Sequence, residues 1–405
     1  MDIPAFSVHA TGMPLFMSTR HYKILLLIAV PVLLTGWLMH IVSWRPRVIG
    51  THGNPRGGDG MPMDVAFAPK GDMIAVSRQH VLTGRDARGQ WATTTNEIEL
   101  CRVRNGDVIK KLHALTKTPQ RGESVGPFQK IEFSPDGRTL LGCSFNGDAA
   151  LMNVETGNTV FLRRGTHRPS DAKYSHLRYR FIGFSRDSTQ VLLTEQWRRQ
   201  AAPRSENKVL HRAYMVTLDT KTGALLSRVP LSLRIGEWPE RVAIMPDRRI
   251  LVCSTEVGDD SSGWSSGGKV LCFDVMSGQR LRVLQQGFSE TIDLACSPTK
   301  ALVAVSWEQS NLEPHGAQLF DLERTRSITV QTGAGERPSN FTFSPDGKLL
   351  AGISGERIRT WDTATGRITH NLGKVSWKLR NLRLSPDGQT LAWTEDKVAQ
   401  IRRAK

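Results

Sequence analysis

The strongest constraint on the fold is a tight-turn sequence that recurs, with variations, seven times. In the stretch "FSPDGKLLAGIS", which starts at Phe343, proline presets φ at one turn position and glycine accepts a positive φ at another. The apolar run that follows the turn suits a short buried strand. Six further segments share this order of apolar run, turn and apolar run, and they start at Val65, Ile131, Ile182, Val242, Leu294 and Leu382.

The first six units each contain four short apolar segments separated by turns. In the sixth unit these are "NFTF", "KLLAGIS", "IRTWD" and "RITHNL", an order that indicates a four-stranded antiparallel meander. The turn-to-turn spacing ranges from 41 residues (Pro345 to Pro386) to 66 residues (Pro69 to Pro135). Such repeats are typical of the blades of a β-propeller, in which each small sheet buries its faces against its neighbours. The sequence therefore predicts an all-β, seven-bladed β-propeller.

The third predicted strand of several units ends in a hydrophobic residue followed by aspartate. The pairs are Leu218-Asp219, Phe273-Asp274, Phe320-Asp321 and Trp361-Asp362. On these pairs and the turns, residues 46–405 resemble the WD-repeat β-propeller family, and bacterial-type propellers with Ser-Pro-Asp-Gly turns are equally similar. The Gly-His pair that usually opens a WD repeat is absent, so the buried His-Ser-Trp-Asp network of that family is not carried over to this chain.

An apolar segment precedes the repeats. The 19 residues Ile24–Val42 contain no Asp, Glu, Lys or Arg, and a helix of this length spans roughly 28 Å, about the thickness of a bilayer core. A cleaved signal peptide is the alternative, but no small-x-small cleavage site follows the apolar run. We therefore predict a short N-terminal tail over 1–23, a single transmembrane helix over 24–44 and the propeller over 45–405.

The orientation of this single-pass membrane protein stays open. Two basic residues precede the predicted helix closely and three follow it, so the positive-inside rule does not decide between the two orientations. Analogy with bacterial anchored propellers slightly favours a propeller outside the cytoplasm. The cysteines slightly favour the cytoplasm, because their odd number and the absence of C-x-x-C argue against a disulfide framework. A bridge between Cys253 and Cys272 remains open, since these residues could lie on neighbouring strands.

The seventh unit ends after its third strand, so its outer strand must come from elsewhere. An open ring would leave sheet edges exposed, and exposed edges promote aggregation. We expect the segment 45–52, "RPRVIGTH", to supply the missing strand by pairing near Val398–Arg402. The alternative is a frayed seventh blade.

In a four-stranded meander the first and third connections lie on one face of the ring, and the other connections lie on the opposite face. The first face would then carry the tight turns, and we call it the tight-turn face. The opposite face, here the long-loop face, would carry the variable segments, which are Arg78–Asn96, Ala114–Phe128, Arg163–Arg180, Glu195–Arg212, Glu256–Gly268 and Trp307–Gly316. Long loops on a rigid scaffold are where function usually resides.

Two of these segments are strongly basic. Arg163–Arg180 has a net charge of +5 and Glu195–Arg212 has +3, within a chain of net charge +16. They should be neighbours, because the first joins blades 2 and 3 and the second lies within blade 3. A basic patch with interleaved aromatic residues suits an anionic partner, although solvated loops with no dedicated partner are the alternative. The proposed partner-binding residues are Arg163, Arg164, Arg168, Lys173, Tyr174, Arg178, Arg180, Trp197, Arg198 and Arg199.

The sequence contains no recognisable catalytic constellation. "GWSSG" formally matches the nucleophile-elbow pattern, but it lies in a Ser/Gly-rich stretch rather than between a strand and a helix. The eleven histidines show neither H-x-H nor H-E-x-x-H spacing, and no glycine-rich phosphate loop is present. We therefore predict no catalytic, cofactor-binding or metal-binding residues. Three acidic residues flank first strands that would line a central channel, namely Asp64, Glu132 and Asp293.

These features favour a membrane-anchored interaction scaffold that binds a protein partner, or anionic lipid, through its long-loop face. Nucleic acid is disfavoured as a partner because the chain is predicted to be tied to a membrane, and a monomer is expected. The alternatives are a propeller enzyme, such as a hydrolase or lyase with its site at the central channel, and a structural envelope protein. Convergent carboxylates, histidines or a metal at the channel mouth would indicate an enzyme.

Overall fold

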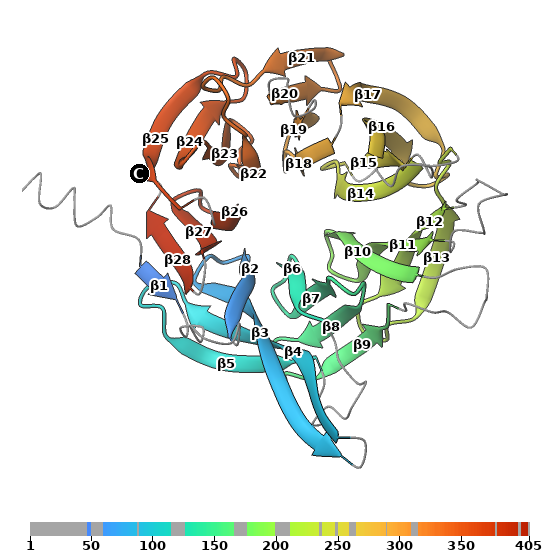
Figure 1. Ribbon diagram of the computed structural model, residues 1–405, viewed down its shortest axis with the longest axis vertical. Coiled ribbons are helices and arrows are strands. Elements are labelled where there is room, and N and C mark those ends of the chain that lie inside the picture. The colour runs from blue at the N-terminus through green and yellow to red at the C-terminus, as the bar shows by residue number, and fades with distance from the viewer. Residues whose placement is uncertain are drawn as a thin grey trace, which may run out of the picture. The chain divides into compact units, whose positions relative to one another are not determined.

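A computed structural model describes residues 47–49, 60–86, 89–114, 126–165, 176–198, 211–234, 237–247, 250–258, 265–288, 290–308, 315–376, 379–395 and 398–403. Over these ranges the chain forms 28 strands in seven four-stranded antiparallel sheets arranged as a ring (Figure 1). The predicted all-β, seven-bladed propeller is therefore confirmed. The predicted tail 1–23 and transmembrane segment 24–44 lie outside the described residues. Within the described residues, no helix has the length and apolar character needed to span a bilayer.

Blades 1 to 6 each use four consecutive strands. Blade 1 contains β2 (Met61–Phe67), β3 (Met73–Asp86), β4 (Gly89–Arg102) and β5 (Val108–His113). Blade 2 contains β6 (Phe128–Phe133), β7 (Thr139–Ser144), β8 (Ala149–Asn153) and β9 (Thr159–Arg163). Blade 3 contains β10 (His176–Phe184), β11 (Gln190–Arg198), β12 (His211–Asp219) and β13 (Leu225–Pro230).

The next three blades repeat this order from the channel outward. Blade 4 contains β14 (Glu237–Ile244), β15 (Ile250–Gly258), β16 (Ser265–Asp274) and β17 (Arg280–Phe288). Blade 5 contains β18 (Glu290–Cys296), β19 (Leu302–Glu308), β20 (Gly316–Asp321) and β21 (Arg326–Thr329). Blade 6 contains β22 (Ser339–Phe343), β23 (Leu349–Ser354), β24 (Arg357–Asp362) and β25 (Ile368–Lys374).

Blade 7 combines strands from both ends of the described chain. It contains β26 (Leu379–Leu384), β27 (Thr390–Glu395), β28 (Val398–Arg403) and, as its outer strand, β1 (Arg47–Ile49). The antiparallel register places Arg47 opposite Ile401 and Ile49 opposite Ala399. The segment that follows the apolar run Ile24–Val42 thus pairs with the last strand over three residues. This pairing closes the ring (Figure 1).

The hydrophobic core lies between the blades rather than within them. Each cluster of buried apolar side chains draws its members from two adjacent sheets. The cluster between blades 1 and 2, for example, contains Ile98, Phe128 and Ile131, all fully buried. Burying each such side chain is worth about 1.5–3 kcal/mol, so each blade depends on its neighbours for most of its stability.

The tight turns are held by short polar networks. In blade 2, Ser134 Oγ donates to Asp136 Oδ1 at 2.6 Å and accepts from Thr139 N at 3.0 Å, while Gly137 has a φ of 73°. The same serine–aspartate pair recurs in the turns of blades 3, 6 and 7. The turns also contact one another, since a Cβ added to Gly137 would lie 3.4 Å from Pro69 Cδ of blade 1. The recurring turn sequence therefore closes each first hairpin and connects neighbouring blades.

The aspartates that end several third strands have a local role. Asp362 Oδ1 accepts hydrogen bonds from Thr365 N at 2.8 Å and Thr365 Oγ1 at 2.7 Å. Hydrogen bonds from Thr365 lower the pKa of Asp362, and those from Thr222 lower the pKa of Asp219 in the same way. These carboxylates cap the turn into the outer strand, which explains their place in the repeat.

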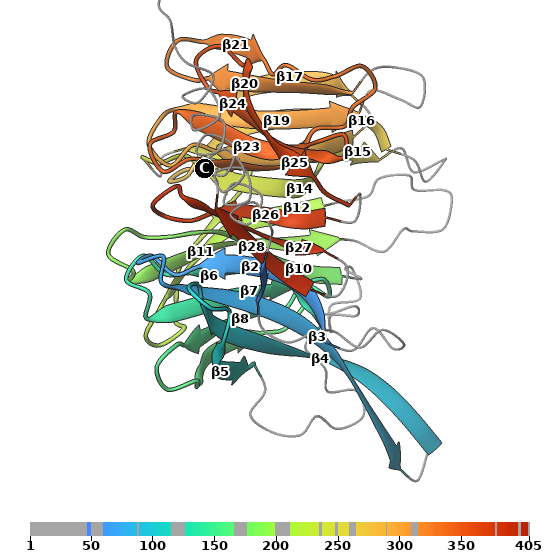
Figure 2. The same cartoon turned by 90° about the vertical axis from the view of Figure 1, so that its left-hand side faces the viewer.

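The segment Arg78–Asn96 differs from the loop that the sequence suggested. The strands β3 and β4 pair without interruption from Met73 opposite Arg102 to Asp86 opposite Gly89. The two views show this hairpin extending beyond the ring (Figure 1 and Figure 2). Its polar and glycine content suggested a loop, but threonine and tryptophan in the second strand favour extended structure.

The possible bridge between Cys253 and Cys272 is not formed. The two residues do lie on the neighbouring strands β15 and β16, but Cys272 is a free, buried thiol. The register places Cys253 opposite Leu271 and Cys272 opposite Val252, so the two cysteines are offset by one residue. Adjacent positions on a strand face opposite sides of the sheet, so this backbone register does not suit a bridge between the two strands.

Replacing Arg47–Ile49 by Gly-Ser-Gly, which preserves chain length, should weaken the closure of blade 7. We expect the Tm to fall by about 3–6 °C, because β28 loses its outer partner and becomes a sheet edge. Thermal unfolding of the full-length protein measures this effect. A matched control is Gly-Ser-Gly in place of the exposed tight-turn residues 323–325 of blade 5, which should change the Tm less. Equal melting of all three proteins would contradict ring closure by β1.

Candidate functional site

The seven first strands surround a central channel with a free volume of about 1560 Å³. Polar residues recur at one position of these strands, five residues before the turn position that proline occupies in most blades. We call these residues the polar belt, and they are Asp64, Lys130, Arg241, Asp293, Asn340 and Asn381, with Phe181 in the same position of blade 3. The strand register is irregular at or beside this position in all seven first strands. Such β-bulges redirect side chains and backbone groups, here toward the neighbouring blade.

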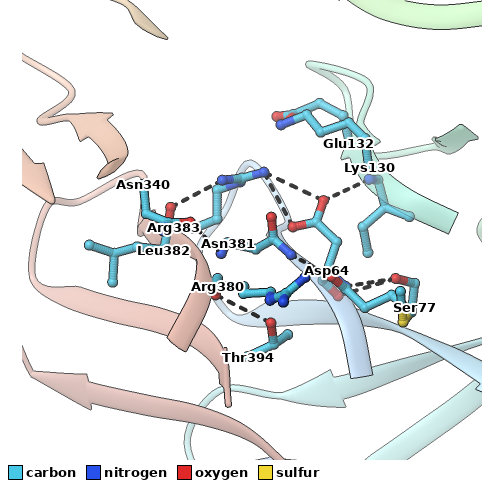
Figure 3. A network of polar contacts seen from close by, with 12 residues as sticks. Asp64, Ser77, Lys130, Glu132, Asn340, Arg380, Asn381, Leu382, Arg383 and Thr394 are labelled. Atoms are coloured by element: carbon cyan, nitrogen blue, oxygen red, sulfur yellow. Dashed lines mark hydrogen bonds and ion pairs between the residues drawn. The ribbon is translucent and has the colours of Figure 1, made fainter. Parts of the chain in front are cut away.

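Asp64 connects three blades through one fully buried carboxylate. Its Oδ2 accepts from Ile131 N of blade 2 at 2.9 Å, and its Oδ1 lies 3.2 Å from Arg383 Nη2 of blade 7. Figure 3 shows Asp64 and Arg383 pointing toward each other. Ser77 adds a further contact, since its Oγ accepts from Asp64 N at 3.0 Å and donates to Phe128 O at 2.8 Å. Burial raises the pKa of Asp64, and the positive charges of Arg383 and Lys130 oppose this increase.

Equivalent contacts join other pairs of first strands. Asp293 of blade 5 accepts from Phe341 N of blade 6 and lies 3.9 Å from Arg241 Nη1 of blade 4. Asn381 N donates to Asn340 Oδ1 at 2.7 Å, which joins blades 6 and 7. The belt carboxylates and amides are thus engaged with the next blade, and this engagement makes the belt a set of connections between blades.

The junction between blades 2 and 3 is built differently. Its belt position in blade 3 is Phe181, whose ring has neither a hydrogen-bond donor nor an acceptor of the ordinary kind. On the facing strand β6, Lys130 and Glu132 pair with each other at 3.2 Å and are 38% and 41% exposed. Strand β6 therefore presents one partly exposed cation and one partly exposed carboxylate to the channel.

Arg163, one of the predicted partner-binding residues, has a structural contact. Its half-buried guanidinium donates through Nη2 to Gly223 O at 3.0 Å, which ties blade 2 to the turn of blade 3. Its neighbour Arg164 is exposed. Arg163 is therefore a blade-to-blade contact, whereas Arg164 faces solvent at the start of the basic segment.

Four predicted residues lie outside the described residues, namely Arg168, Lys173, Tyr174 and Arg199. Arg198 ends β11, and only its backbone is described. The remaining residues, Arg178, Arg180 and Trp197, lie on the paired strands β10 and β11, where Arg178 is opposite Gln196 and Arg180 is opposite Thr194. The first basic segment thus ends on β10, which pairs with β11, the strand on which the second basic segment begins.

The hairpin formed by β10 and β11 contains a carboxylate, Glu195, that pairs with a neighbouring arginine. Glu195 Oε1 accepts from Arg228 Nη2 at 2.6 Å and from Trp197 Nε1 at 2.6 Å. The Arg228 guanidinium also lies 3.6 Å from the centre of the Tyr214 ring. Burial and the adjacent Glu195 raise the pKa of Tyr179 to about 12. Trp197 and Tyr179 therefore belong to a set of contacts around Glu195 on the paired strands β10 and β11.

The sequence analysis missed several residues that line the channel. Phe145, Arg241, Arg380 and Arg383 all line it, and Phe145 is exposed. The repeat pattern showed that first strands would face the channel, but it did not show where each strand bulges. Phe145 lies in a short turn, "SFNG", that resembles an ordinary hairpin connection in the sequence.

Comparison with known proteins gives no relatives from which a function could be transferred. No family model matches the chain, and no curated protein sequence matches it. The structure by itself defines the class of the protein as a seven-bladed β-propeller.

Asp64→Ala should destabilise the propeller by about 3–5 kcal/mol, because it leaves the Ile131 amide and the Arg383 guanidinium without their buried acceptor. Asp64→Asn should cost less, since the amide oxygen still accepts one hydrogen bond. Urea unfolding of the full chain compares the two variants with the wild type. If Asp64→Ala unfolds at the wild-type urea concentration, the belt does not connect the blades.

Proposed function

We propose that this chain is a WD-repeat-like propeller anchored in a membrane by residues 24–44, and that it acts as an interaction scaffold rather than as an enzyme. Its partner is an anionic protein that binds the long-loop face of a propeller monomer. The observation that carries this proposal is the convergence of the two basic segments, of net charge +5 and +3, on the paired strands β10 and β11. Clustered cations on one face raise the rate and selectivity of association with an anionic partner.

The contrast between the two faces supports this choice. On the tight-turn face, turn carboxylates such as Asp136 and Asp362 are occupied by hydrogen bonds within their own turns. The opposite face carries the connections that differ in length and charge from blade to blade. Variable segments on a repeated scaffold can be shaped for one partner without disturbing the blades.

The remaining features of the proposal follow from the sequence. The apolar segment 24–44 ties the propeller to a bilayer, and analogy with bacterial anchored propellers favours a position outside the cytoplasm. Anionic lipid headgroups are a second possible contact of the basic segments. Nucleic acid is not expected to reach a membrane-bound propeller in this setting.

The proposal is tested by reversing charges on the full-length protein. Arg164→Glu, Arg198→Glu and Arg199→Glu together should weaken capture of the cellular partner roughly 10- to 100-fold, because like charges then face each other. Capture by the wild type should also fall with added salt, as expected for exposed charges. Capture is measured by affinity purification from detergent-solubilised cells, followed by quantitative mass spectrometry.

A matched control places the same charge change on the tight-turn face. Arg138→Glu, Lys221→Glu and Arg367→Glu together alter three exposed cations there and should leave capture unchanged. If both triple variants lose the partner equally, the net charge of the domain rather than the long-loop face determines binding. If neither loses it, the proposed interaction face is wrong.

A further inference from the structure

The β3–β4 hairpin continues past the strands that flank it in blade 1. The inner strand β2 pairs with β3 only as far as Gln79, and the outer strand β5 pairs with β4 only as far as Glu97. The pairing of β3 with β4 continues beyond these residues to the tip of the hairpin. Residues 81–86 and 89–95 therefore form a two-stranded ribbon, which extends beyond the ring (Figure 1 and Figure 2).

The outer edges of this ribbon have no strand partner among the residues that the structure describes. Gly60 N donates to Gln79 O at 2.6 Å, so the backbone groups of Gln79 point toward β2. Hydrogen-bonding groups alternate between the two edges of an antiparallel strand, and β3 pairs with β4 without a register shift. By this alternation Thr93 bonds to β3, whereas the N–H and C=O groups of Ala92 and Thr94 point to the outer edge of β4.

The two edges of the ribbon differ in their suitability for a further strand. An isolated two-stranded ribbon is only marginally stable in water, and its open edges are templates for pairing. Edges that stay unpaired usually carry charged residues or proline. The β3 edge contains Arg85 and Asp86, but the segment Gly89–Thr95 of β4 contains neither a charged residue nor proline. Trp91 and the threonines of this segment also favour extended structure. The β4 edge is therefore the one suited to accept a strand.

The sequence of the β4 edge is complementary to itself. An antiparallel pair of two copies centred on Thr93 places Thr93 opposite Thr93, Ala92 opposite Thr94, and Trp91 opposite Thr95. Thr–Thr and aromatic–β-branched pairs stabilise antiparallel strands, and no charged residue takes part in this register. Two chains that each have a net charge of +16 repel each other, so a contact between copies needs an uncharged surface. This edge supplies such a surface, and it has no charge that would select an acidic strand instead.

We propose that the β3–β4 ribbon is a homodimer interface, in which the β4 edges of two copies pair antiparallel about Thr93 and form a four-stranded sheet. Such an interface is isologous, since each copy contributes the same residues. The ribbon lies beyond the ring, where a second copy meets it without entering the seven sheets (Figure 2). The contact is small because each copy contributes one short strand, so we expect a weak dimer with a Kd in the micromolar range.

Dimer formation goes beyond the proposed function. The sequence predicted a monomer, and pairing through the ribbon would correct that prediction. Each copy in the dimer still offers the long-loop face of one propeller to the anionic partner. The dimer and the partner-binding face are therefore separate proposals, and either can fail without the other.

Cysteine crosslinking of the full-length protein in permeabilised cells tests the pairing. In Thr93→Cys the two new thiols meet at the two-fold axis, where facing Cα atoms are about 4.5–5.5 Å apart and a disulfide can form. Thr83→Cys on β3 is the matched control, because three strand spacings, about 14 Å, would separate its two copies. With a copper–phenanthroline oxidant, we expect Thr93→Cys to give at least tenfold more disulfide-linked dimer than Thr83→Cys or the wild type.

A proline variant tests whether the outer edge of β4 makes the contact. Thr94→Pro removes an N–H group that points to this edge and none that bonds to β3. It should therefore lower crosslinking of Thr93→Cys at least tenfold with little change in the Tm. Unchanged crosslinking in this double variant would overturn the proposal.

The comparison of the two cysteine positions has further outcomes. More dimer from Thr83→Cys than from Thr93→Cys would place the contact on β3 and overturn the proposal. Wild-type levels of dimer at both positions would overturn it as well, and so would a Thr93→Cys crosslink to a different protein in place of a second copy. None of these results bears on the basic segments, which the charge-reversal variants test.

Discussion

The structure depends on mutual burial of neighbouring sheets. A four-stranded sheet of this size cannot cover its own two faces, and each apolar cluster of the propeller is shared between two blades. A series of such sheets leaves two faces and an outer edge uncovered until the last blade meets the first. The pairing of β1 with β28 completes blade 7, and the cluster of Val65, Ile74 and Ile401 covers the faces of blades 7 and 1.

Polar contacts near the channel supplement this apolar packing, because they specify which blades meet and in which register. Asp64 and Asp293 each accept from the backbone of the following blade and face an arginine of the preceding blade. Buried charges are costly unless they are paired and hydrogen-bonded, so these contacts favour one order and one register of the blades. The junction of blades 2 and 3 lacks a polar side chain at Phe181 and leaves Lys130 and Glu132 accessible. The described ends of the two basic segments, Arg163–Gly165 and Glu195–Trp197, also belong to blades 2 and 3.

Local chemistry explains which features were predictable from sequence. The turn sequences and their spacing predicted seven four-stranded sheets, because proline, glycine and aspartate each have a defined role in the turns. The missing last strand predicted a partner near Arg47. The extended β3–β4 hairpin was not predicted, since its stability depends on pairing across 14 residues rather than on an apolar pattern. The contact of Arg163 with Gly223 and the place of Phe145 at the channel were also hidden, because both depend on how neighbouring blades meet, which the repeat pattern does not specify.

Hydrogen–deuterium exchange on the full-length protein tests ring closure most directly. The account predicts that backbone amides of Val398–Arg403 exchange as slowly as those of third strands in the other blades, such as Arg357–Asp362. It also predicts protection in Arg47–Ile49, the short outer strand. Rapid exchange of both segments, with the other six sheets protected, would show an open ring and would contradict the account.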